Sequence, residues 1–286
     1  MPEALLRLDA LTCAYADGAP VLSDVGLEIR AGETLLIAGT PGSGKSTLLR
    51  HLNGLLRPAS GRVLLRGKDI HRDKKTLRHA RAEVGLVFQF PEHQLFAATV
   101  AEDIAFGPRW RGLGAEETAA RVEEARIFAD LAPEILSRPP QALSGGEKRR
   151  AALAGVMAAH PSVLALDEPL AGLDPLTGRE LMARLREWRD GGERALIIVT
   201  HDLEEAARTS DRLLVLREGR VAALGPLPQV LLGEETGLPL PAMPLLGRAL
   251  AARGIATGED VLSADEMAER LLALWPAEGK VGGGRA

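Results

Sequence analysis

Short apolar runs rich in Val, Ile and Leu recur along the chain between polar or Gly-containing stretches. Runs of this length and composition are typical of strands that are buried on both faces of a parallel sheet. They occupy residues 33–38, 84–88, 163–166, 195–199 and 212–216. The pattern therefore predicts a central, mostly parallel β-sheet.

Amphipathic segments lie between several of these runs. Helices are expected at 45–55, 175–189 and 202–208, where Asp202 is suited to cap the last of them. Strands that alternate with helices predict an α/β fold whose ligands bind at the carboxyl ends of the strands. The first thirty residues, with LLRLDAL and VLSDVGLEIR, instead predict antiparallel strands beside the main sheet.

The alternation stops at residues 90–160, where three stretches are helix-like and none has a strand pattern. A Pro-rich linker at 237–244 precedes two further helical stretches at 245–253 and 263–274, and the last eight or so residues are expected to be disordered. The predicted domains are a core of residues 1–89 and 161–235, an inserted helical subdomain at 90–160, and a C-terminal extension at 236–286.

Composition narrows the class of protein. The 286 residues are 46% hydrophobic and 26% charged, which permits a sizeable core and is not typical of disorder. The net charge of −4 gives no general attraction to nucleic acid, and the basic run at 71–81 is interpreted as a solvated connection. The lone Cys13 excludes an internal disulfide and fits a reducing compartment. No signal peptide and no apolar stretch of the roughly 18 residues that a membrane span needs is found, so a cytoplasmic protein is expected.

A phosphate-binding loop is the clearest chemical motif. Gly39, Gly44, Lys45 and Ser46 fit the pattern G-x-x-x-x-G-K-[ST] between an apolar strand and a helix. The glycines let successive backbone N–H groups face a β-phosphate, Lys45 spans the β- and γ-phosphates, and Ser46 is the expected Mg²⁺ ligand. The residues predicted to bind nucleotide here are Gly39, Thr40, Pro41, Gly42, Ser43, Gly44, Lys45, Ser46 and Thr47.

Polar residues follow the neighbouring strands. Asp167 and Glu168 end the run VLAL, so Asp167 is expected to hold Mg²⁺ and Glu168 to orient or deprotonate the attacking water. His201 follows IIVT and can reach a γ-phosphate, whereas Gln89 follows GLVF and can reach Mg²⁺ or the water. The predicted catalytic residues are Glu168, His201 and Gln89, and the predicted Mg²⁺ ligands are Ser46, Gln89 and Asp167.

A second anion site is predicted in ALSGGEKRRAALAGVMAAHP, at residues 142–161. Ser144 is followed by Gly145 and Gly146 and then by a helix-forming run. Backbone N–H groups at such a helix start attract anions.

Taken in order, the phosphate loop, Gln89, LSGGE, VLALDEP, AGLDP and His201 resemble the ATPase domain of ABC transporters, over residues 3 to about 232. The resemblance implies a P-loop NTPase fold with an inserted helical subdomain, and ATP and Mg²⁺ as cofactors. In that family the LSGGE loop of one chain holds the γ-phosphate of the ATP on its partner. Ser144, Gly145 and Gly146 would then complete the partner's site, and two chains would pair over two ATP molecules.

The same resemblance assigns Asp174 of AGLDP to a link between the two sites, and Tyr15, the single tyrosine, to stacking on adenine. Glu147 stands where Gln is usual in the family. Because it follows the phosphate-binding glycines, it is not expected to impair closure over ATP.

A finer resemblance comes from FPEHQLFAATVAEDIAFGPRWRGL, after Gln89, and from the C-terminal piece RALAARGIATGEDVLSADEMAERL. Both are similar to the energy-coupling-factor subclass, which imports vitamins or cobalt and nickel ions. This resemblance implies a transmembrane T component, a substrate-binding membrane subunit and a peripheral location on the cytoplasmic face of the membrane. Glu92 is the candidate acidic contact with the T component. The six histidines show no metal-ligand spacing, so the handling of a metal ion would rest on partner proteins.

Other functions remain as alternatives. The chain could instead be the ATPase of a conventional ABC importer, which would differ in its membrane partners. In either case the second ATPase chain can be identical to this one or a related paralogue. A DNA-repair or chromosome-associated ABC ATPase would carry a long coiled-coil insertion between Gln89 and LSGGE, where fewer than sixty residues stand here. A small-molecule kinase would have no use for LSGGE.

Overall fold

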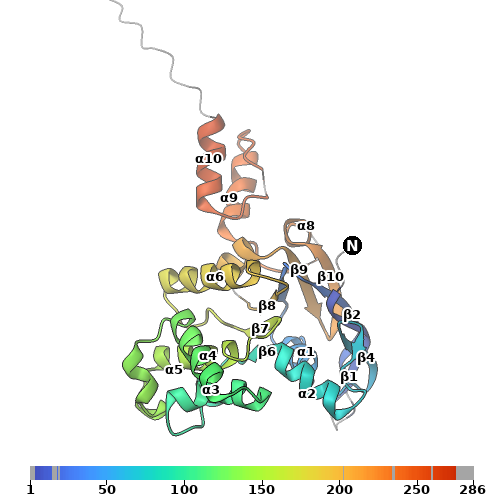
Figure 1. Cartoon of the computed structure of the whole chain (residues 1–286). Coiled ribbons are helices and arrows are strands. Elements are labelled where there is room, and N and C mark those ends of the chain that lie inside the picture. The colour runs from blue at the N-terminus through green and yellow to red at the C-terminus, as the bar shows by residue number, and fades with distance from the viewer. Residues whose placement is uncertain are drawn as a thin grey trace, which may run out of the picture.

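The computed structural model describes residues 4–14, 18, 20–201, 203–233, 236–258 and 260–274, without the side chains of residues 91, 92 and 205. Its centre is a six-stranded sheet in the order β10-β9-β3-β8-β7-β6 (Figure 1). The strands are β3 (Thr34–Ala38), β6 (Val84–Val87), β7 (Val163–Asp167), β8 (Ala195–Val199), β9 (Arg212–Arg217) and β10 (Arg220–Pro226). All neighbouring pairs are parallel except β9 with β10. The predicted parallel sheet is confirmed, and β10 was not predicted.

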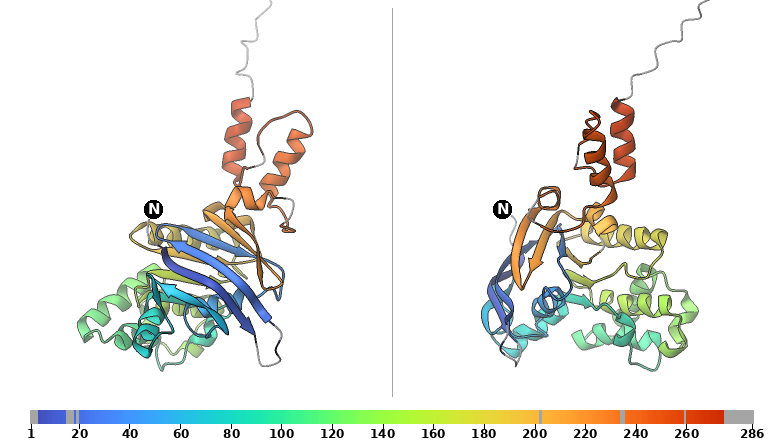
Figure 2. Two further views of the ribbon diagram at one scale, coloured as in Figure 1. Left: turned by 90° about the vertical axis from the view of Figure 1, so that its right-hand side faces the viewer. Right: turned by 180° about the vertical axis from the view of Figure 1, so that it is seen from behind.

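A second sheet of four antiparallel strands has the order β2-β1-β4-β5. It consists of β1 (Ala4–Ala14), β2 (Pro20–Arg30), β4 (Ser60–Leu65) and β5 (Lys68–Asp69). The antiparallel pair near the N-terminus was predicted, whereas β4 and β5 were not. Figures 1 and 2 show this sheet on the side of the molecule opposite the green helices of the insertion.

Both faces of the main sheet are buried, because successive side chains of each strand point to opposite faces. On β3, Leu35 and Ile37 pack toward α1 (Lys45–Leu52) and the small sheet. Leu36 packs on the other face, with side chains from the insertion and from α6 (Pro175–Asp190). Such double burial explains why the strands appear in the sequence as unbroken apolar runs.

The insertion between β6 and β7 is helical. Its elements are α3 (Val100–Arg111), α4 (Ala115–Phe128) and α5 (Gly145–Met157), with 3₁₀ turns at Pro91–Gln94, Pro133–Ser137 and Pro140–Ala142. The predicted fold class, a P-loop type α/β sheet with N-terminal antiparallel strands and helices inserted in this region, is confirmed. The exact domain limits remain predictions.

The basic run at 71–81 was wrongly interpreted as a connection, because most of it belongs to α2 (Lys74–Glu83). Asp73 caps this helix by accepting a hydrogen bond from the Thr76 N–H at 2.8 Å. Ala80 is its buried anchor, while most of the charged side chains face solvent.

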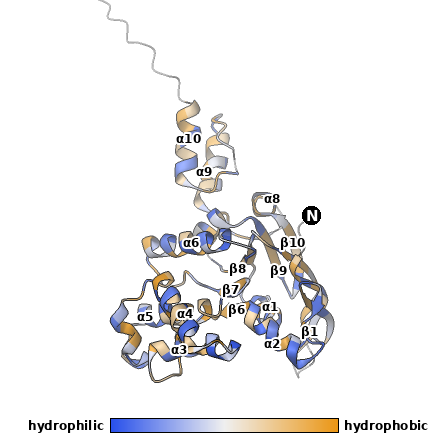
Figure 3. Cartoon of the chain, viewed as in Figure 1, coloured by the Kyte–Doolittle hydropathy of each residue, from blue (hydrophilic) through white to orange (hydrophobic). Residues whose placement is uncertain are grey.

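The remaining helices lie late in the chain. They are α7 (Leu203–Ala206), which continues as a 3₁₀ turn at Ala207–Thr209, and α8 (Leu227–Leu231), α9 (Ala242–Ala251) and α10 (Ala264–Leu274). The predicted cap Asp202 lies outside the described residues. Apolar residues are scattered along both α9 and α10 (Figure 3), but no helix in the described ranges is long and apolar enough to span a membrane.

Candidate functional site

The loop between β3 and α1 has a conformation that its glycines make possible. Gly39 has a φ of +154°, and a Cβ atom at this position would lie 2.2 Å from the carbonyl oxygen of Leu216. The loop turns back on itself, since the Ser43 N–H donates to the Thr40 carbonyl at 3.1 Å. Gly39 thus permits the close approach of the loop to β9.

Lys45 opens α1 and points into this loop. Its Nζ donates to the carbonyl oxygens of Gly39 at 2.8 Å and Thr40 at 3.0 Å. Burial lowers the pKa of the ammonium, although the nearby Glu168 and Asp167 oppose that effect. The Ser43 hydroxyl is buried without a hydrogen-bond partner in the described part of the chain. The loop therefore combines a cation and a spare hydroxyl, which suits an anionic ligand.

Asp167 is the last residue of β7 and is only 7% exposed. Burial raises the pKa of its carboxyl and the Glu168 charge adds to this rise, whereas a hydrogen bond from the Ser46 side chain and the Lys45 charge oppose it. A hydroxyl and a carboxylate are oxygen ligands of the kind that Mg²⁺ prefers. The pair formed by Ser46 and Asp167 therefore fits a magnesium ion.

Glu168 follows directly and is held by several hydrogen bonds. Its carboxylate accepts from the Thr200 hydroxyl at 2.9 Å and from the His201 N–H at 3.1 Å, and it lies 2.8 Å from His201 Nδ1. The backbone of Glu168 is left-handed, with a φ of +52°. The Glu168 side chain is 10% exposed, whereas that of His201 is 72% exposed. A carboxylate fixed in this way beside an open histidine can orient a water molecule.

These groups meet at one edge of the sheet. The phosphate loop follows β3, Asp167 and Glu168 stand at the end of β7, His201 comes two residues after β8, and the exposed Gln89 comes two residues after β6. Parallel pairing of β3, β8, β7 and β6 places all four carboxyl ends at the same edge. The clustering expected from the sequence is present.

Ser144, Gly145 and Gly146 lie elsewhere, at the start of α5, which Figure 1 shows among the inserted helices and apart from α1. Ser144 and Glu147 form a reciprocal cap. The Ser144 Oγ accepts from the Glu147 N–H at 3.3 Å, and the Glu147 carboxylate accepts from the Ser144 N–H at 2.7 Å. Added Cβ atoms at Gly145 and Gly146 would meet no atom within 4 Å. The helix start is thus open to a ligand.

Asp174 caps α6 and has a similarly local role in the single chain. It accepts from the Thr177 hydroxyl at 2.6 Å and from two backbone N–H groups at 3.1 Å. The hydrogen bonds from Thr177, chiefly that of the hydroxyl, lower the pKa of its carboxyl. These hydrogen bonds fix the start of α6, which follows Glu168 closely in the sequence.

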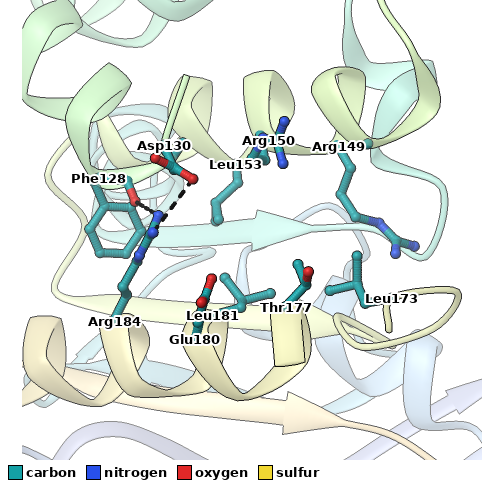
Figure 4. Close-up of a pocket in the computed structure, with 12 residues that line it drawn as sticks. Phe128, Asp130, Arg149, Arg150, Leu153, Leu173, Thr177, Glu180, Leu181 and Arg184 are labelled. Carbon is teal, nitrogen blue, oxygen red and sulfur yellow. Dashed lines mark hydrogen bonds and ion pairs between the residues drawn. The ribbon is translucent and has the colours of Figure 1, made fainter. Parts of the chain in front are cut away.

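Helices α5 and α6 face each other across a cavity of about 80 Å³. Figure 4 shows Leu153 of α5 and Leu181 of α6 lining it, and Arg184 bonded to the Phe128 carbonyl and Asp130. Arg149 of α5 donates a hydrogen bond to the carbonyl of Ala171, in the loop that leads to Asp174. The helix that begins at the predicted second anion site therefore contacts the loop that follows Glu168 and leads to Asp174.

Two of the residues predicted to bind a ligand or partner cannot be placed. Tyr15 lies outside the described residues, and so does the side chain of Glu92. Thr200 was not among the predicted site residues, although its hydroxyl contacts Glu168 and the residue is only 1% exposed. The signal available was its place at the end of an apolar strand, directly before His201.

Three exposed aromatic residues follow Gln89 in the sequence. Phe90, Phe96 and Phe106 are 57%, 65% and 52% exposed, and the rings of Phe96 and Phe106 meet edge to face with centroids 5.1 Å apart. Buried Asp103 fixes the intervening loop by accepting from the N–H groups of Phe96 and Ala97, each at 3.1 Å. Exposed apolar side chains gathered in this way are typical of a contact surface.

Comparison with known proteins agrees with this geometry. Residues 22–171 match the family model described as ABC transporter. The chain is 46% identical over 267 residues to the energy-coupling factor transporter ATP-binding protein EcfA2 of Symbiobacterium thermophilum, which covers 90% of this chain and 92% of the relative. It is 48% identical over 227 residues to the cobalt import ATP-binding protein CbiO of Rhodobacter capsulatus, with coverage of 79% and 80%.

A solved ATP-binding cassette, MJ0796, has been described as a dimer in a post-hydrolysis state bound to ADP and phosphate. It superimposes with a TM-score of 0.71 at 30% identity, over 78% of this chain and 98% of the other. Motifs, fold and relatives agree along most of the sequence. This chain therefore belongs to the ABC transporter family, as an ATP-binding cassette.

Proposed function

We propose that the chain is the ATPase subunit of an energy-coupling-factor transporter. Two ATPase chains close over two Mg-ATP, and their movement drives the import of a vitamin or of a cobalt or nickel ion through membrane partners. Similarity to EcfA2 over 90% of the chain and 92% of the relative supports this class. The CbiO relative supports a transition-metal ion as one possible cargo.

In the proposed reaction, residues 39–47 bind the phosphates of ATP, and Lys45 turns from the loop carbonyls to the β- and γ-phosphates. Ser46, Asp167 and Gln89 would hold Mg²⁺, which neutralises charge that develops on the phosphate oxygens. Glu168 accepts the proton of the attacking water. Thr200 and His201 keep its carboxylate in place, and His201 also faces the γ-phosphate.

The second half of each site would come from the partner chain. Ser144, Gly145 and Gly146 would bind the γ-phosphate on the partner's Lys45, where the start of α5 supplies about half a positive charge. Asp174 would connect the two sites and Tyr15 would stack on adenine. This role explains why the open glycines of α5 lie apart from the phosphate loop of the same chain.

Membrane partners would bind near Gln89. The exposed Phe90, Phe96 and Phe106 offer an apolar surface for the coupling helices of a T component, and Glu92 is the candidate for an ionic contact. A movement there would reach the ATP site through Gln89. The chain would work at the cytoplasmic face of the membrane, together with a substrate-binding membrane subunit.

The observation that carries the proposal is the fixed carboxylate of Glu168 between Asp167 and His201. Glu168→Gln should keep ATP affinity near that of the wild type and lower turnover about 10²- to 10⁴-fold, the usual contribution of a positioned base. Steady-state phosphate release and calorimetric ATP binding measure the two quantities. Glu193→Gln, at a side chain that is 79% exposed, is the control. Near-normal turnover in Glu168→Gln would remove Glu168 from this role.

A further inference from the structure

The segment that follows His201 is short and firmly packed. Helix α7 begins at Leu203, two residues after His201, and runs into the 3₁₀ turn Ala207–Thr209. Leu203, Ala206 and Ala207 are at most 4% exposed and belong to the core on the α6 side of the sheet. Because a single residue separates His201 from α7, a shift of α7 displaces the backbone of His201.

The first contact of this segment with the C-terminal extension lies at the start of α9. The Oε2 atom of Glu204 accepts a hydrogen bond from the Ala242 N–H at 2.9 Å. The N-cap residue of α9, Pro241, supplies no side-chain cap. The first N–H groups of a helix lack partners within the helix, and a carboxylate is favoured there. Glu204 therefore caps α9 from the His201 segment.

The second contact lies just before α10. The Nε of Arg208 donates to the Leu262 carbonyl at 3.3 Å, and Leu262 packs against the core. Arg208 Nη2 also lies 4.0 Å from the Glu204 carboxylate. One short segment thus contacts the beginnings of both C-terminal helices.

Beyond these contacts the extension projects from the molecule. Figures 1 and 2 show α9 and α10 side by side and pointing away from both sheets. Leu245 on α9 and Leu272 on α10 are 52% and 73% exposed. A displacement of the extension therefore acts on the molecule chiefly at its base, where Glu204 and Arg208 lie.

We propose that Glu204 and Arg208 are positioning residues that link the C-terminal extension to His201. The orientation of His201 beside Glu168, and with it the rate of ATP hydrolysis, then depends on the position of α9 and α10. This inference rests on the proposed function, because it assumes that Glu168 and His201 act on ATP. Glu204 and Arg208 themselves touch neither nucleotide nor water in this account.

The test uses steady-state ATPase kinetics and calorimetric ATP binding with the full-length chain. Glu204→Ala and Arg208→Ala should each lower kcat about fivefold, the bias that one ordinary hydrogen bond gives to a two-state equilibrium. ATP affinity should change by less than about twofold, because the phosphate loop is not touched. Glu204→Gln should restore most of the rate, since its amide oxygen can still accept from Ala242. Hydrogen exchange at residues 200–204 should be faster in both alanine variants.

Matched controls are Glu117→Ala and Arg121→Ala, which break a pair of the same i,i+4 spacing on α4, at 3.4 Å. Arg208→Lys keeps the charge, removes the Nε donor and is the milder variant if an alanine variant does not fold. If the kcat values of Glu204→Ala and Arg208→Ala lie within about twofold of those of the control variants, the proposed coupling is wrong. If Glu168→Gln abolishes hydrolysis and Glu204→Ala does not lower it, the coupling alone fails. If Glu168→Gln hydrolyses ATP normally, the proposed function fails.

Discussion

At the scale of single residues, the site holds its reactive groups under constraint. Glu168 has a left-handed backbone, which costs a residue other than glycine free energy and persists only where the surroundings enforce it. Hydrogen bonds from Thr200 and His201 fix the carboxylate, and the backbone N–H of Glu168 donates to the Val199 carbonyl at 2.8 Å. The orientation of Glu168, the proposed base, is therefore fixed without ATP.

Asp167 offers a test in which stability and function change in opposite directions. Burial raises the pKa of its carboxyl above the ordinary 3.8, so the folded protein binds this proton more tightly than the unfolded chain does. The folded state therefore loses stability as the pH rises through this raised pKa. In Asp167→Asn the side chain carries no charge at any pH, so this loss of stability is absent. The amide oxygen of the asparagine can still accept the hydrogen bond from Ser46. At pH 7 without Mg²⁺, the unfolding temperature of the variant should therefore exceed that of the wild type.

The same variant should lower Mg²⁺-dependent turnover by about a hundredfold or more, because a metal ligand is lost. The difference in unfolding temperature should vanish as the pH approaches 3.8. Thermal melts from pH 4 to 8 and phosphate release measure both effects, and Asp265→Asn on exposed α10 is the control. A variant that is less stable at pH 7 yet fully active would contradict both the buried charge and the metal role.

Most of the candidate site could be predicted from single residues, because its members follow apolar strands. Asp167, Glu168 and His201 needed only the rule that parallel strands end at one edge. Thr200 could not be recognised, since a threonine after a strand is common and its bond to Glu168 comes from tertiary packing. The roles given to Tyr15 and Asp174 rest on resemblance, because their proposed ligands belong to a bound nucleotide or to a second chain.

At the scale of elements, the start of α5 is the predicted second anion site. The Glu147 carboxylate accepts the Ser144 N–H, and this bond lowers the pKa of Glu147 first, with the Arg138 charge as a smaller cause. A negative charge thus stands in the first turn of the helix that is proposed to bind phosphate. The two capping bonds use the N–H groups of Ser144 and Glu147 and not those of Gly145 and Gly146. That Glu147 does not impair closure remains a prediction.

The substitution Gly146→Ala should change the ATP-dependent pairing of two chains without disturbing the fold of one chain. The position is helical and open, so alanine should leave the fold intact and stabilise α5 by up to about 1 kcal/mol. The added methyl group should obstruct the close approach of a partner's γ-phosphate and weaken ATP-dependent pairing by about tenfold or more. Gly155→Ala, farther along the same helix, is the control. Its added Cβ would lie 3.8 Å from the nearest atom, the carbonyl oxygen of Asp103, which is an ordinary contact distance. Unchanged pairing in Gly146→Ala would argue against phosphate contact at this turn.

Prediction of elements succeeded where the chain is strongly patterned. The five predicted strands of the main sheet, β3, β6, β7, β8 and β9, each consist largely of buried apolar residues. The helices after the phosphate loop and after Asp174 have clear starts. Strand β4 was not recognised because its first three residues, Ser60, Gly61 and Arg62, are exposed and polar. Helix α2 was not recognised because its charged face dominates the sequence, and only Ala80 is fully buried.

At the scale of the whole molecule, we propose that each chain contains two half-sites on different parts of the fold. The phosphate loop and Glu168 stand at the edge of the main sheet, whereas the open glycines of α5 belong to the inserted helices. In the proposed pair, two chains in head-to-tail symmetry would bring each half-site opposite its complement, as a two-fold interface allows. ATP would then favour the closed pair because it would contact both chains only in that state.

The most direct test of this account is the mass of the Glu168→Gln protein, measured by size exclusion with light scattering with and without Mg-ATP. Slow hydrolysis should hold the nucleotide between the chains. The account predicts a shift from monomer to dimer on addition of Mg-ATP. With Gly146→Ala added to the same protein, about tenfold or more protein should be needed for the same dimer fraction. A protein that binds Mg-ATP and remains a monomer would contradict closure of two identical chains over shared sites.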